Sequence, residues 1–68
     1  MRFEIKWGDR SVVHETEEAA KAAARTLFPE CEFGGWDRDH TQLAVWANRN
    51  GHTDVVAVIV DHDIVMPW

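Results

Sequence analysis

One short helical segment, with strand-like sequence on both sides of it, constrains the fold of this chain more than any other feature. Thr16 is a residue type that caps helices, and Glu17 and Glu18 follow it in the first turn, where the helix dipole favours acidic side chains. Pro29 ends the segment, because the residue before a proline resists helical geometry. The sequence therefore predicts a single helix from residue 17 to residue 27 or 28.

The apolar side chains of this segment follow a helical period. Its i, i+3, i+4, i+7, i+8 stripe consists of Ala20, Ala23, Ala24, Leu27 and Phe28. Because alanine is small, the helix axis can approach a neighbouring surface closely. We expect that neighbour to be the flat face of a β-sheet.

The rest of the chain carries strand patterns. Phe3, Ile5 and Trp7 alternate with charged residues, which predicts a half-buried strand. A short returning strand or an extended loop follows at 11–14, and further strands are expected at 31–36, bent at Gly34-Gly35, at 42–47 and at 53–60. The Asn50-Gly51 pair predicts a hairpin between the last two.

These elements predict one α+β domain spanning residues 1–68, with one helix on one face of an antiparallel sheet of four or five strands, in the order β(β)αβββ. A domain of this size buries only about 60% of the surface that its unfolded chain exposes. The single cysteine, Cys31, cannot form a disulfide within the chain, so the fold depends on a small core or on association. We expect Trp7 and Trp46 to belong to that core, whereas Trp36 and Trp68 could be either core residues or exposed anchors.

The charge balance limits the partners. Twelve acidic and seven basic residues give a formal net charge of −5, and no Lys or Arg follows Arg49. Nucleic-acid binding needs clustered basic side chains, so the chain is not expected to bind nucleic acid directly. No apolar stretch is long enough to span a membrane, and we expect a cytoplasmic protein, in the host cytoplasm if a phage encodes it.

No motif indicates catalysis. Ser11 is the only serine and lacks a nucleophile-elbow context, and the Asp61-His62-Asp63 triplet is a weak metal pattern because its histidine points away from its carboxylates in a strand. The sequence therefore predicts no enzyme activity, no cofactor and no metal.

Acidic residues recur at i, i+2 spacing. In a strand this spacing places two carboxylates about 6.6 Å apart on one face, close to two successive steps of a nucleic-acid backbone. Such rows could imitate phosphates, although an acidic surface could also serve solubility alone. The candidate partner contacts are Glu30, Glu32, Asp37, Asp39, Asp54, Asp61 and Asp63, with Trp36 as an apolar anchor.

The chain resembles the anti-CRISPR proteins, the small inhibitors that phages and mobile elements encode against host defence. The resemblance lies in the compact size, the capped helix at Thr16–Ala20, and the acidic segments Glu30–Asp39 and Asp54–Asp63. It implies a protein that binds a nuclease or surveillance complex where nucleic acid would lie. Because these proteins share a role and no common fold, the resemblance assigns no residue.

The sequence hypothesis is therefore a non-enzymatic inhibitor that blocks the basic, nucleic-acid-binding surface of a larger protein or complex, such as a CRISPR-Cas complex, through an acidic face. The alternative is a small structural or accessory protein that acts by homodimerisation, through strand pairing or tryptophan burial.

Overall fold

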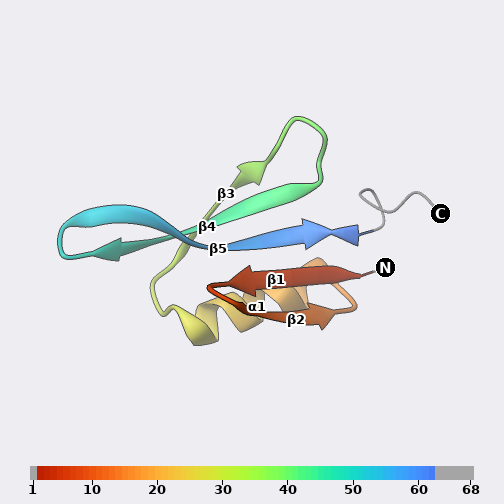
Figure 1. The fold of residues 1–68 in the computed structure, drawn as a ribbon, viewed down its shortest axis with the longest axis horizontal. Helices are drawn as coiled ribbons and strands as arrows, with labels where there is room; N and C mark the ends of the chain where they lie inside the picture. The colour runs from red at the N-terminus through yellow and green to blue at the C-terminus, as the bar shows by residue number, and fades with distance from the viewer. Residues whose placement is uncertain (1, 63–68) are drawn as a thin grey trace.

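The computed structural model describes residues 2–62, with Arg49 described by its backbone alone. These residues form one antiparallel sheet and one helix (Figure 1). The elements are β1 (Phe3–Trp7), β2 (Arg10–His14), α1 (Glu17–Leu27), β3 (Glu32–Trp36), β4 (Gln42–Arg49) and β5 (His52–Asp61). The sheet order is β2-β1-β5-β4-β3. The predicted α+β architecture is confirmed, and the uncertain second strand is a full member of the sheet.

Two tight turns set the register of the hairpins. Gly8, with φ of 57°, opens the two-residue turn between β1 and β2, a conformation that glycine adopts without strain. Asn50 and Gly51, with φ of 51° and 85°, form the turn between β4 and β5. Two successive positive φ values are typical of the type I′ turn that Asn-Gly favours, so the predicted hairpin is confirmed.

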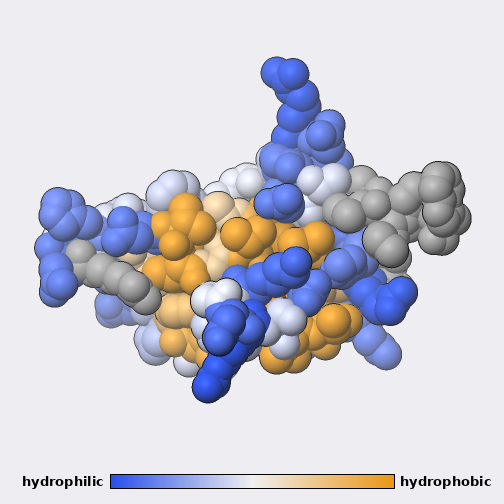
Figure 2. All heavy atoms as spheres, viewed as in Figure 1, coloured by the Kyte–Doolittle hydropathy of each residue, from blue (hydrophilic) through white to orange (hydrophobic). Residues whose placement is uncertain are grey.

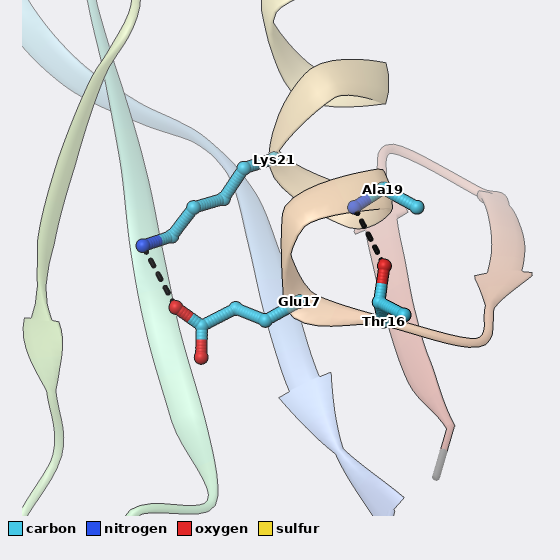
Figure 3. A network of polar contacts seen from close by, with 4 residues as sticks. All are labelled: Thr16, Glu17, Ala19 and Lys21. Atoms are coloured by element: carbon cyan, nitrogen blue, oxygen red, sulfur yellow. Dashed lines mark hydrogen bonds and ion pairs between the residues drawn. The ribbon is translucent and has the colours of Figure 1, made fainter.

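The helix begins and ends where its sequence signals lie. The Thr16 Oγ1 accepts a hydrogen bond of 3.0 Å from the Ala19 N–H, and Lys21 Nζ lies 2.8 Å from a Glu17 carboxylate oxygen (Figure 3). The first contact satisfies an unpaired backbone donor, and the second is an i, i+4 ion pair on the helix surface. At the other end the Phe28 N–H donates to the Ala24 carbonyl at 2.8 Å, one residue before Pro29.

The core lies between α1 and the face of the sheet that α1 covers. Its members are Phe3, Ile5, Ala20, Ala24, Leu43, Val45, Ala57 and Ile59. Ala20 and Ala24 are fully buried, so the alanine stripe does let the helix approach the sheet closely. Trp7, Phe28 and Cys31 pack against this cluster as partly buried side chains.

Two predicted core residues lie outside the core. Leu27 is 41% exposed, because it lies on the side of α1 toward the edge strand β2, where it lines a groove with Val12. Trp46 is 37% exposed, because it points to the face of the sheet opposite α1. The prediction that both side chains are core residues is therefore wrong.

The end of the β4–β5 hairpin projects past the rest of the sheet. β1 pairs with β5 only over residues 58–61, and β3 pairs with β4 only up to Trp46. Residues 47–49 and 52–56 consequently have strand partners only in each other. We call residues 46–56 the arm; in Figure 1 it extends to the left, beyond the helix.

Candidate protein-binding surface

The acidic residues that the sequence pointed to do not form one row. Five of them are exposed and are spread over several elements: Glu30 in the α1–β3 turn, Glu32 at the start of β3, Asp37 and Asp39 in the β3–β4 loop and Asp54 in the arm. In Figure 1 the β3–β4 loop and the tip of the arm project in different directions. The fold therefore disperses these charges instead of aligning them.

Asp37 holds the β3–β4 loop together. Its Oδ1 accepts hydrogen bonds from the backbone N–H groups of Thr41 at 2.8 Å and Gln42 at 3.4 Å, and its Oδ2 accepts from the Thr41 hydroxyl at 2.8 Å. These bonds, led by the Thr41 N–H, hold the pKa of the Asp37 carboxyl below its ordinary value. Asp37 thus stabilises the conformation of the β3–β4 loop.

Three further candidate contacts lie elsewhere than expected or are not described. Asp61 is only 9% exposed, so it does not belong to a solvated acidic surface. Trp36 is partly buried against the core, with its ring centroid 6.2 Å from that of Phe3, and so it serves the core instead of standing out as an anchor. Asp63 and Trp68 lie outside the described residues.

The face of the sheet opposite α1 is covered by no helix of residues 2–62, and we call it the helix-free face. Because successive side chains of a strand alternate, the residues between the core positions point to it. By register with one another they are Glu4 and Lys6 on β1, Ser11 and Val13 on β2, Val58 and Val60 on β5, Gln42, Ala44 and Trp46 on β4, and Glu32 on β3. In Figure 1, α1 lies behind β1 and β2, so Figure 2 shows this face.

Apolar side chains continue along this face into the arm. The β4–β5 pairing shifts register next to Val45, so that Val56 is an extra residue on β5 and Val55 lies opposite Trp46. This bulge turns Val55, which simple alternation would direct to the α1 side, toward the helix-free face. Figure 2 shows hydrophobic surface over the middle of the sheet and hydrophilic surface at the tip of the arm.

Trp46 and Val55 form the exposed centre of this apolar surface, which we call the arm patch. They are 37% and 48% exposed. Counting back from the Asn50-Gly51 turn makes them a non-hydrogen-bonded pair, the kind in which facing side chains approach most closely. The Trp46 Nε1 lies 3.2 Å from where a β-carbon on Gly34 would be, so the absence of a side chain there lets the indole lie over β3.

A shallow groove of about 360 Å³ runs beside the arm patch. Val55, Val58 and Val60 of β5 line it, with Lys6 and Gln42 on its two sides. Glu32 lies opposite Trp46 on β3, and Asp54 immediately precedes Val55. Because side chains alternate along a strand, Asp54 points to the opposite face of the arm, and the apolar surface is bordered by the acid Glu32 on β3 and by the cation Lys6 on β1.

A polar cluster occupies the opposite end of the helix-free face. The His62 Nε2 lies 2.7 Å from Glu4 Oε1, and the Glu4 side chain is 16% exposed. Hydrogen bonds from Ser11 and then from His62 hold the pKa of the Glu4 carboxyl below its ordinary value of 4.5, against a smaller opposing effect of burial. The cluster ties the end of β5 to β1 and β2.

The order of these groups differs from that of an activated nucleophile. In a serine-based triad the histidine contacts the serine and the carboxylate orients the histidine. Here the Glu4 carboxylate accepts from both Ser11 and His62 and so lies between them. The arrangement joins the end of β5 to β1 and β2, and the carboxylate holds the central position that the histidine has in a triad.

Residues 2–62 contain no group of three or more His, Cys, Asp or Glu side chains placed to hold a metal ion. Within the same residues, no helix is of the length and apolarity needed to cross a bilayer. Comparison of the chain with protein-family models, with curated proteins and with solved structures finds no match.

The sequence interpretation missed the arm patch. It assigned Trp46 to the core because the residue lies in a β-rich run, and it placed Val55 in the strand predicted at 53–60. One signal was available: both residues lie only a few positions from the Asn50-Gly51 turn, where a hairpin can extend past the neighbouring strands.

Proposed function

We propose that this chain is a non-enzymatic protein-binding module whose contact surface is the arm patch with the valine groove beside it. The observation that carries the proposal is the exposure of Trp46 and Val55, side by side, on a face of the sheet that α1 does not cover. Tryptophan is among the residues that most often dominate the energy of protein interfaces.

Folding alone does not account for these two side chains. Trp46 and Val55 point to the face opposite α1, and neither belongs to the buried cluster, so they contribute little to the core between α1 and the sheet. Polar strand formers such as threonine would keep the hairpin and lower the cost of exposing apolar surface to water. An apolar pair kept at this place is typical of an interaction site.

The border of the patch indicates the chemistry of the partner. Glu32 is an exposed acid next to the apolar pair, so a complementary surface would offer an apolar pocket with a basic side chain beside it. Blocking a basic, nucleic-acid-binding surface of a larger protein, such as a CRISPR-Cas complex, is the specific form of this function that we propose to test first. In this form the exposed acidic residues steer association and the arm patch supplies most of the affinity.

Affinity capture from a cell lysate, quantified by mass spectrometry, tests the proposal. Trp46→Ala and Val55→Thr should each lower the recovery of a specific partner, by about thirtyfold for Trp46→Ala if it behaves as an interface hot spot. Leu27→Gln is the matched control, since Leu27 is equally exposed but lies on α1, away from the arm. A partner recovered equally by the wild type and by both arm variants would contradict the proposal.

The acidic border is tested separately. Glu32→Gln should weaken binding less than Trp46→Ala does and should reduce its dependence on salt concentration. Neutralisation that abolishes binding, while Trp46→Ala leaves it intact, would favour charge mimicry in place of the apolar contact.

A further inference from the structure

A second group of exposed apolar side chains lies at the other side of the molecule, on and above the edge strand β2. Val12 and Val13 are 46% and 52% exposed and point to opposite faces of the sheet. Leu27 of α1, which is 41% exposed, lines a groove of about 290 Å³ together with Val12. Most of the large hydrophobic side chains that the described residues expose therefore gather at this edge.

The hairpin turn determines which backbone groups of β2 face outward. Trp7 and Arg10 flank the two-residue turn, and such a flanking pair is hydrogen-bonded. Hydrogen-bonded pairs alternate with non-hydrogen-bonded pairs along an antiparallel ladder, so Val12 bonds to β1, whereas Ser11 and Val13 do not. The N–H and C=O groups of Ser11 and Val13 consequently point away from the sheet.

No strand within residues 2–62 pairs with this outer edge. The other edge strand, β3, is interrupted by a register shift between Phe33 and Trp36, at Gly34-Gly35, and such an irregularity discourages pairing with another chain. The central part of β2, Ser11 to Val13, has no proline, charge or bulge that would protect it. Of the two edge strands, β2 is therefore the one whose outer backbone groups can pair with a further strand.

We propose that two copies of this chain associate by antiparallel pairing of their β2 strands, with Val12 at the two-fold axis. In this register Ser11 of one copy faces Val13 of the second copy, and all the outward backbone groups of both residues are used. The two Val12 side chains meet on the α1 side of a continuous sheet. This inference is independent of the arm patch, which lies at the far end of each copy and stays accessible.

The sequence of β2 favours a second copy as its partner. Its outward residues, Ser11 and Val13, flank Val12 symmetrically, so an identical strand running in the opposite direction supplies matching donors and acceptors. In this register Arg10 faces His14 of the second copy and Glu15 faces Asp9. The facing acids oppose the pairing, so the backbone hydrogen bonds and the contact between the two Val12 side chains must carry it.

Sedimentation equilibrium of the wild-type chain over a concentration series tests the proposal. We expect a monomer–dimer equilibrium and, in hydrogen-exchange experiments, slower exchange of the Ser11 and Val13 amides as concentration rises. Val13→Pro removes an outward N–H and keeps the bonds to β1, so it should weaken dimerisation by at least about tenfold while the circular dichroism stays native. Val13→Thr keeps the N–H and is the matched control.

A charge reversal makes the test independent of proline. In the proposed register Glu15 faces Asp9 of the second copy, so Glu15→Arg should strengthen the dimer. A chain that stays monomeric at millimolar concentration would overturn the proposal. A dimer that persists in the folded Val13→Pro variant would also overturn the proposal. A dimer that dissociates in the Trp46→Ala variant would overturn it too, because that result would place the contact at the arm.

Discussion

The part of the sheet that α1 covers and the arm are built from the same kind of sequence and serve different purposes. β1 and the second half of β5 present Ile5 and Ile59 to the helix, and both side chains are fully buried. The arm continues β4 and β5 beyond the helix and exposes Trp46 and Val55. The same β-branched and aromatic residues thus stabilise the fold under the helix and offer a contact surface beyond it.

The largest difference between the two regions should appear on truncating one apolar side chain in each. Ile59→Ala leaves a cavity in the core and should cost about 2–5 kcal/mol, much of the stability that a domain of this size has. Val55→Ala, in the arm, should cost under about 1 kcal/mol, because the side chain is already half-exposed. Urea unfolding of both variants measures this difference. Equal losses would mean that the arm contributes to the core.

A smaller effect is expected from enlarging the alanine stripe. Ala24 is fully buried between α1 and the sheet, so Ala24→Leu should push the helix away and cost about 1–3 kcal/mol. Ala22 is exposed on the same helix, and Ala22→Leu should change the unfolding free energy by less than about 0.5 kcal/mol. If Ala24→Leu were tolerated as well as its control, the helix would not be seated as closely as described.

The helix cap should have an effect of about 1 kcal/mol. Thr16→Ala removes the hydrogen bond to the Ala19 N–H and so lowers the stability of the covered region alone. Thr26 provides the control, because its hydroxyl donates to the Ala22 carbonyl inside the helix, and Thr26→Ala should be neutral or slightly stabilising. Thermal unfolding of the two variants separates these outcomes. A cap effect no larger than that of Thr26→Ala would argue against the Thr16 contact.

The smallest effect concerns acid stability. The pKa of Glu4 is lowered in the folded chain by hydrogen bonds from Ser11 and His62, so ionised Glu4 stabilises the fold fully above its unfolded pKa. This contribution is lost as the pH falls below 4.5 and through the lowered folded pKa. Glu4→Gln should therefore flatten the decline of the melting temperature in this pH range. The exposed Glu18→Gln variant should show the wild-type dependence of melting temperature on pH. If this dependence were unchanged in both variants, the contacts of Glu4 would not contribute to acid stability.

Local patterns made most of the fold predictable. Alternation at Phe3, Ile5 and Trp7, the cap at Thr16 and the Asn50-Gly51 turn each specify an element through contacts between near neighbours in the chain. For this reason the α+β prediction and the helix boundaries are confirmed. The pairing of β1 with β5 is different, because no short loop joins these two strands and no local pattern specifies it.

The candidate site could not be predicted in the same way, because exposure depends on which face of the sheet the helix covers and on where the pairing shifts register. Trp46 has the sequence context of a core residue and is exposed because it points to the face opposite α1, where the bulge at Val56 also places Val55. The contact between Glu4 and His62 joins residues 58 positions apart, and no short pattern indicates it. Likewise, i, i+2 spacing suggested an acidic row, whereas Asp37 is engaged in its own loop and Asp61 is buried.

Native-state hydrogen exchange on the dilute, isolated chain tests most directly whether the arm is a contact surface that adds little to stability. The Ile59 amide lies in the central strand and should exchange only through global unfolding. The Asp54 amide, which bonds to Ala47 within the arm, should exchange through local opening at a much lower free energy. If the Asp54 amide were protected as strongly as that of Ile59, the arm would belong to the cooperative core, and the distinction between the two regions would be wrong.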